Sequence, residues 1–329
     1  MRITKFVILL TVFWPLALKA SLPDTTVLLP TLPQQFLEDR FQQIQQSFEE
    51  RATLFLKGKP FQPWTPNKPQ HSRQNEFNQI NEWRTHTWYV DPNARPLISR
   101  TDFRVAQDLL EKGLYRHPTF IAFDYNRTDG HYNSSTIVLN GFKFLALEAP
   151  THTTLRNFFL LLQNFRVTQL ICLSQSEEPE KDKSVAYWTG HLKSEPKSKE
   201  TYLRIPARYN LSPYSLRYYS MNNWVQNRGT DPKELLRLIL KVKKNYQPNE
   251  LIACQSSHGN GRAGTFIAGF LLITEIDRQL AAGTALKSLD ISIEKIVMQL
   301  SLQRPYLVKT SEQYMTLYRL VDLYIKNLI

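Results

Sequence analysis

One segment, Leu251–Phe266, constrains the fold more than the rest of the 329 residues do. It begins with the short apolar run Leu-Ile-Ala-Cys, which is typical of a buried strand. Glycines then allow a tight loop, and the apolar stretch Gly264–Leu280 predicts a long helix. A strand, a tight loop and a helix in this order direct successive backbone N–H groups inward at the helix N-terminus. Such a nest binds a tetrahedral dianion.

Arg262 enters at the start of that helix, where its guanidinium can donate to two phosphate oxygens at once. An ordinary glycine-rich turn with a surface arginine accounts for the same residues, so the segment alone leaves both interpretations open. The loop is not a nucleotide-binding P-loop, because no Gly-Lys-Ser/Thr follows it. The expected phosphate-binding residues are Ser257, His258, Gly259, Asn260, Gly261 and Arg262.

Charge and composition limit the class of protein. The chain has 41 Lys and Arg against 29 Asp and Glu, and its formal net charge of +12 favours an anionic partner. Nucleic acid, a membrane surface and phosphate are all anionic partners of this kind. Hydrophobic residues make up 42%, which excludes a fully disordered or fibrous chain. The only cysteines, Cys172 and Cys254, lie in apolar segments and cannot form a disulfide framework.

The first twenty residues have the pattern of a secretory signal. Basic residues at Arg2 and Lys5 precede an apolar run, and Ala20 supplies a small residue at a plausible cleavage point. The apolar run is short for a membrane span, although an uncleaved anchor stays the alternative. We therefore expect a secreted or periplasmic protein with no stable membrane span after cleavage. A secreted chain without a disulfide framework indicates a bacterial or otherwise unusual exporter.

The rest of the chain predicts one domain behind an extension. Residues 21–81 form the N-terminal extension, in which apolar residues at helical spacing predict an amphipathic helix over Gln34–Lys57. Residues 82–329 form the domain. Its patterns mix strands and helices with little strict alternation, so we predict an α+β fold with a twisted mixed sheet flanked by helices. The expected strands are Thr136–Val138, Phe142–Leu147, Val167–Leu173 and Glu250–Ala253, and the expected later helices are Thr154–Phe165, Pro232–Tyr246, Gly264–Leu280, Leu289–Leu302 and Ser311–Leu328.

Six motifs in one order, in addition to the glycine-rich loop, resemble those of the protein tyrosine phosphatases. The glycine-rich loop is similar to that family's signature, His-Cys-x-x-Gly-x-x-Arg-Ser/Thr-Gly, and the resemblance covers about Tyr115–Ile329. It implies the family's α+β fold and a pocket for a phosphorylated ligand, with no metal and no cofactor. The other matching segments are Phe123–Arg127, His131–Thr136, Phe144–Pro150, Lys183–Trp188, Asn223–Gln226 and Lys309–Tyr314.

The largest departure from the family is at the nucleophile. Counting back six from Arg262 places Ser256 where the family has its cysteine thiolate. A serine hydroxyl has a far higher pKa, and no partnered base is evident for it. Cys254 lies two residues too early to replace the cysteine, so we interpret it as a buried strand thiol.

The resemblance also implies changes around the nucleophile. Gln226 occupies the general-acid position, and an amide cannot protonate a leaving phenolate as a carboxylic acid does. Ala263 lacks the hydroxyl that assists the nucleophile. Lys309 replaces the first of two glutamines that position water, although Gln313 keeps the second. The residues at substrate-recognition positions are His117, Lys183 and Lys309, and Thr119 replaces the aspartate that holds the peptide backbone.

Three functions remain open from the sequence. In the first, the chain is an exported, catalytically impaired phosphatase-like protein that binds a phosphorylated protein or small molecule, and nucleic acid is not expected. In the second, it is an active tyrosine or inositol-phosphate phosphatase, or a nucleophile-substituted form of one. In the third, it is a scaffold whose pocket is vestigial.

Overall fold

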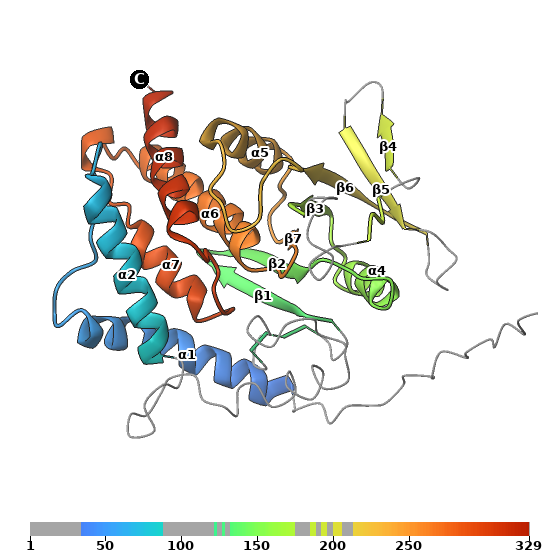
Figure 1. Ribbon diagram of the computed structural model, residues 1–329, viewed down its shortest axis with the longest axis horizontal. Helices are drawn as coiled ribbons and strands as arrows, with labels where there is room; N and C mark the ends of the chain where they lie inside the picture. The colour runs from blue at the N-terminus through green and yellow to red at the C-terminus, as the bar shows by residue number, and fades with distance from the viewer. Residues whose placement is uncertain are drawn as a thin grey trace, which may run out of the picture. The chain divides into compact units, whose positions relative to one another are not determined.

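The computed structural model describes residues 34–87, 122–123, 127–128, 132–174, 185–188, 192–195, 200–205 and 213–328 (Figure 1). The expected signal peptide, residues 1–20, and the predicted recognition residues His117 and Lys183 lie outside these ranges. Within them, no helix is both long and apolar enough to cross a membrane.

A seven-stranded mixed sheet forms the centre of the fold, with the order β1-β2-β7-β3-β6-β5-β4 (Figure 1). Strands β2, β7, β3 and β6 run parallel, while the pairs β1–β2, β6–β5 and β5–β4 are antiparallel. The strands are β1 (Ser134–Leu139), β2 (Phe142–Glu148), β3 (Gln169–Cys172), β4 (Leu192–Glu195), β5 (Glu200–Ile205), β6 (Tyr214–Ser220) and β7 (Leu251–Ser256).

Helices cover both faces of this sheet. Helix α4 packs on one face, and α5, α6, α7 and α8 lie on the other (Figure 1). The helices are α1 (Gln34–Phe55), α2 (Gln70–Thr87), α4 (Leu155–Asn164), α5 (Pro232–Lys244), α6 (Gly261–Ala281), α7 (Ile293–Ser301) and α8 (Ser311–Lys326), and a short 3-10 turn covers Leu286–Ser288. The predicted α+β fold, with a mixed twisted sheet flanked by helices, is confirmed.

Alternating burial explains the position of the central strands. In β7, Ala253 belongs to the core beneath α4, while its neighbours Ile252 and Cys254 belong to the core beneath α6. Neighbouring β2 alternates in the same way, with Leu145 on the α4 side and Phe144 on the α6 side. Because strand residues point to opposite faces in turn, continuous apolar runs favour a position with both faces covered. This arrangement places the end of β7, at Ser256, in the middle of the sheet edge.

The N-terminal helices share a core with the helices that follow the sheet. The described parts of α1 and α2 contribute to the same apolar cluster as α6, α7 and α8, and Leu32–Ile329 forms one compact unit. The expected boundary between residues 81 and 82 falls inside α2, Gln70–Thr87. Arg84 of α2, 2% exposed, donates to the carbonyl oxygens of Leu307 at 2.6 Å and Val308 at 2.9 Å.

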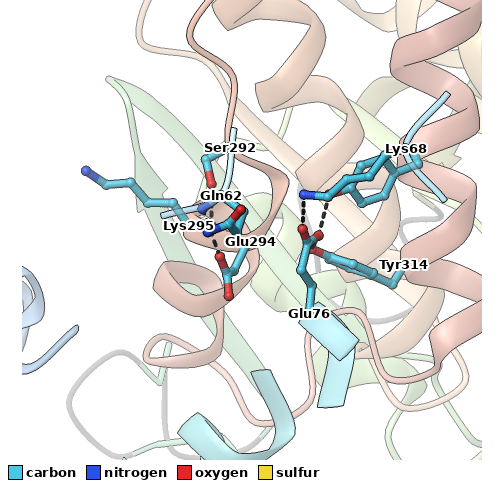
Figure 2. Close-up of polar contacts among 8 residues, drawn as sticks. Gln62, Lys68, Glu76, Ser292, Glu294, Lys295 and Tyr314 are labelled. Atoms are coloured by element: carbon cyan, nitrogen blue, oxygen red, sulfur yellow. Dashed lines mark hydrogen bonds and ion pairs between the residues drawn. The ribbon is translucent and has the colours of Figure 1, made fainter. Parts of the chain in front are cut away.

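Buried polar contacts join α2 to α8, and α7 to the segment between α1 and α2 (Figure 2). Glu76 of α2 pairs with Lys68 and accepts a hydrogen bond from the Tyr314 hydroxyl at 3.0 Å. Glu294 of α7, 1% exposed, accepts from the backbone N–H of Gln62 at 3.2 Å. The other carboxylate oxygen of Glu294, Oε1, is buried and has no partner among the described residues. A carboxylate this deeply buried is costly unless neutralised, so the protonation of Glu294 matters for stability.

Candidate phosphate-binding site

The glycine-rich loop connects β7 to α6 as the sequence predicts. Strand β7 ends at Ser256, Asn260 caps the next helix, and α6 begins at Gly261. Gly259 has a φ of +69°, and a Cβ there would lie 2.5 Å from the carbonyl carbon of Leu147. Only glycine fits that close approach without strain. The loop therefore turns sharply against the end of β2 and leads directly into the helix N-terminus.

A buried arginine from the loop before α8 holds this turn in place through the backbone of His258. The Nη2 group of Arg304 donates to the carbonyl oxygen of His258 at 2.9 Å and to Asn133 Oδ1 at 3.0 Å. Its Nη1 group donates to Ser135 Oγ at 3.0 Å. Arg304 is fully buried, so it acts as a brace that ties the loop to β1. Our sequence analysis missed this residue; a lone arginine within the apolar run 300–308 is the signal that could have found it.

Arg262 lies at the first turn of α6 and is 3% exposed. Its Nη1 donates to the carbonyl oxygen of Trp224 at 3.0 Å, and its Nη2 donates to Ser257 Oγ. The guanidinium is thus held between the glycine-rich loop and the segment that follows β6. An always-charged, planar cation at a helix N-terminus is well placed to hold an anion.

The segment after β6 forms one wall of the site. Trp224 is fully buried and its indole Nε1 donates to the Arg228 carbonyl at 2.9 Å, which folds the segment into a tight loop. Arg228 pairs with Glu312 of α8 at 2.7 Å, and the Gly229 N–H donates to the same carboxylate at 3.1 Å. These contacts hold Gln226 at the mouth of the site.

The start of α8 forms the opposite wall. The Oε1 atom of Gln313 accepts from the backbone N–H groups of Lys309 at 2.8 Å and Thr310 at 3.2 Å, which completes a capping box. Its side chain also packs closely on Gly261, where an added Cβ would lie 2.8 Å from Nε2. Gln313 therefore has a structural role at the helix start as well as a position in the site.

These walls enclose a small pocket of about 20 Å³. It brings together every predicted catalytic and phosphate-binding residue except Gly259, whose tight contact with Leu147 places it in the turn beneath. The structure also adds Asn227, which our sequence analysis did not select. The lining residues are Gln226, Asn227, Ser256, Ser257, His258, Asn260, Gly261, Arg262, Lys309 and Gln313. The pocket has room for about one water, so a larger ligand requires its walls to part.

The two cysteines lie outside this pocket. Cys254 is fully buried in β7, and burial raises the pKa of its thiol well above the ordinary value. Cys172 is fully buried in β3, and burial likewise raises the pKa of its thiol. A buried neutral thiol is a poor nucleophile, since the thiolate is the reactive form. Both residues therefore act as core side chains, in agreement with the interpretation of Cys254 from its position in the sequence.

Comparison with known proteins identifies the family. The protein-tyrosine phosphatase family profile matches residues 115–322, more than half of the chain. The chain belongs to the protein-tyrosine phosphatase family.

Among curated proteins, the chain is similar to the rat receptor-type tyrosine-protein phosphatase epsilon, with 28% identity over 201 residues. That match covers 54% of this chain and 28% of the relative. The human receptor-type tyrosine-protein phosphatase eta is 25% identical over 251 residues, covering 67% of this chain and 18% of that protein. The chain therefore spans less than a third of the length of these relatives.

Solved structures show the same fold at low identity. A protein tyrosine phosphatase from Trypanosoma cruzi aligns with a TM-score of 0.59 and 20% identity, covering 79% of this chain and 93% of that one. A Trypanosoma brucei protein tyrosine phosphatase gives a TM-score of 0.61 with 17% identity, covering 78% and 92%.

Proposed function

We propose that this chain binds a phosphorylated ligand through the loop 257–262 and is catalytically impaired as a phosphatase. The observation that carries the proposal is Arg262, a nearly fully buried cation at the N-terminus of α6 and in the wall of the pocket. The loop amides and the helix N-terminus supply further positive potential for the same anion. A phosphorylated protein and a small phosphorylated molecule both present that anion.

Impairment is proposed from the two residues that the chemistry needs most. Ser256 lies at the end of β7 and lines the pocket, but none of the described His, Asp or Glu side chains lines the pocket except His258. A hydroxyl needs a partnered base to become a nucleophile. Gln226 faces the same pocket and carries no acidic proton. The site is thus suited to holding a phosphoryl group and poorly suited to transferring it.

Removing the bidentate donation by the Arg262 guanidinium tests the proposal that the loop binds a phosphorylated ligand. The variant Arg262→Lys keeps a charge but loses bidentate donation, so affinity for a phosphotyrosine peptide should fall at least about tenfold in calorimetry. Charge-assisted hydrogen bonds contribute ~1.5–3 kcal/mol, and 1.4 kcal/mol corresponds to a decade.

Arg278→Lys is the matched control for that measurement, because Arg278 lies on the same helix, pairs with Glu275 and has a side chain that is 67% exposed. The affinity of Arg278→Lys for the phosphotyrosine peptide should equal that of the wild type. Unchanged affinity in Arg262→Lys would instead favour the scaffold with a vestigial pocket.

We also propose export, supported by the charged, apolar and small-residue order of residues 1–20. N-terminal sequencing of secreted or periplasmic protein should begin near Ser21. Recovery of only the full-length chain, from the cytosol of the producing cell, would contradict it.

A further inference from the structure

Helix α5 presents a row of cations on its exposed side. Leu235, Leu236 and Ile239 on the opposite side are buried in the core, which fixes the orientation of the helix. Glu234 is the only acidic residue of α5, and its Oε2 accepts from the Asn223 side chain at 2.5 Å. The exposed cations, at intervals of three or four residues, are Lys233, Arg237, Lys241 and Lys244.

Two of these cations line a groove. The groove has a volume of about 770 Å³ and lies between α5 and the strands β4, β5 and β6; Glu234, Arg237 and Lys241 line it from α5. Met221 and Leu238 contribute apolar surface to it. The ammonium group of Lys241 lies 5.6 Å from the centre of the Tyr219 ring, which also lines the groove. This cation–π contact favours one position of the charge at the groove rather than a freely moving side chain.

The groove holds one carboxylate for these two cations: Glu234 also lines it, and its Oε2 accepts from the Asn223 side chain. Lys243, on the same helix, pairs with Asp277 of α6. No ion pair joins Arg237 or Lys241 to a carboxylate among the described residues. The cations of the groove outnumber its one carboxylate, so a further anion there would be attracted.

We propose that this groove binds an acidic peptide segment of a partner protein. Aspartate or glutamate side chains would pair with Arg237 and Lys241, with the arginine able to hold a carboxylate at both oxygens. The apolar surface of Met221 and Leu238 would receive the remaining side chains. The volume of the groove is in the size range of ligand sites. A hollow surface of this kind fits a peptide segment of a partner better than it fits a flat membrane surface.

The groove is next to the phosphate pocket but separate from it. Asn223 lines the groove, while Gln226 and Asn227 of the same loop line the phosphate pocket, and the two sites share no lining residue. Binding of an acidic segment therefore does not depend on the proposed phosphate binding. A single partner with a phosphorylated residue and nearby acidic residues could occupy both.

Fluorescence anisotropy with two labelled peptides tests the proposal. An Asp/Glu-rich peptide should bind the wild-type chain, and its Asn/Gln analogue should not. In the double variant Arg237→Gln/Lys241→Gln, affinity for the acidic peptide should fall about fivefold or more at low salt, since exposed ion pairs each contribute a factor of up to about five.

The control changes the net charge equally at exposed positions that do not line the groove. Lys287→Gln/Lys326→Gln should alter the affinity less than about twofold. Equal losses in both double variants, or equal binding of both peptides, would overturn the proposal. Groove-dependent binding to phosphatidylserine vesicles without peptide binding would overturn it in favour of a membrane surface.

Arg262→Lys separates this proposal from the proposed function, because it should keep its affinity for the unphosphorylated acidic peptide. Loss of that affinity would place the peptide in the phosphate pocket and overturn the assignment to the groove.

Discussion

The double variant Ser256→Cys/Gln226→Asp should hydrolyse a phosphotyrosine peptide about 10²–10⁴ times faster than Ser256→Cys alone, in single-turnover assays. The cysteine supplies a thiolate at the end of β7, stabilised by the loop amides and the α6 N-terminus. The aspartate supplies the proton that the leaving phenolate needs, and general acid catalysis contributes a factor of that size. Multiple turnovers should stay slow because the phospho-cysteine should hydrolyse slowly. Ala263 lacks the hydroxyl that assists the nucleophile, and Lys309 replaces a glutamine that positions water.

Ser256→Cys/Gln226→Asn is the matched control, since asparagine has the shape of aspartate but no acidic proton. Its single-turnover rate on the phosphotyrosine peptide should equal that of Ser256→Cys alone. An activated aryl phosphate has a good leaving group, so all three variants should cleave it at similar rates. Equal peptide rates for the Asp and Asn variants would show that position 226 does not deliver the proton.

The wild-type chain should show no turnover above background on phosphopeptides or inositol phosphates. Robust turnover that Ser256→Ala abolishes would mean that Ser256 is a working nucleophile and that the proposed impairment is wrong.

The phosphate loop could be predicted from sequence because its signals are local. The apolar strand, the glycines and the apolar helix lie within residues 251–281, and the structure places them as expected, with α6 beginning three residues earlier than predicted. Gln226 and Gln313 could be selected only through the family's motif order, since each comes from a distant part of the chain. Arg304 acts through the carbonyl of His258, a contact across 46 residues that no local pattern contains.

Helix α2 and strands β4, β5 and β6 were missed for a different reason. The apolar residues of α2 are few and follow a proline-rich stretch, so its polar sequence resembles a loop. Its stability comes from contacts with α7 and α8, which include the hydrogen bonds of Arg84 and the Glu76 cluster. The edge strand β4 has four residues, its neighbour β5 mixes polar and apolar residues, and pairing with the next strand defines both. Tertiary contacts decide the structure in both cases.

The buried carboxyl of Glu294 should make the chain less stable as the pH rises from about 5 to 8. Burial, with a smaller effect from the negative charge of Glu76, raises the pKa of Glu294 to about 7, although the Gln62 amide and Lys68 act in the opposite direction. In the unfolded chain the pKa is 4.5, so the folded state binds the proton more tightly. The stabilising proton is fully present below about pH 4.5 and is lost as the pH rises through 7. The difference between a pKa of 4.5 and one of about 7 corresponds to about 3 kcal/mol.

The variant Glu294→Gln isolates this effect from all other titrations. Glutamine mimics the protonated carboxyl and can still accept from the Gln62 N–H, so the free energy of unfolding of the variant should lie within about 1 kcal/mol of the wild type at pH 5. At pH 8 the variant should be more stable by up to about 3 kcal/mol in urea titrations. Glu49→Gln is the control, because Glu49 is exposed and pairs only at the surface with Lys295; it should change stability by less than about 1 kcal/mol at either pH. A stability difference for Glu294→Gln that is the same at pH 5 and pH 8 would show that this carboxyl does not change its charge over that range. The Glu294 of Figure 2 would then keep one protonation state at both pH values, and the stability of the chain would not depend on its titration.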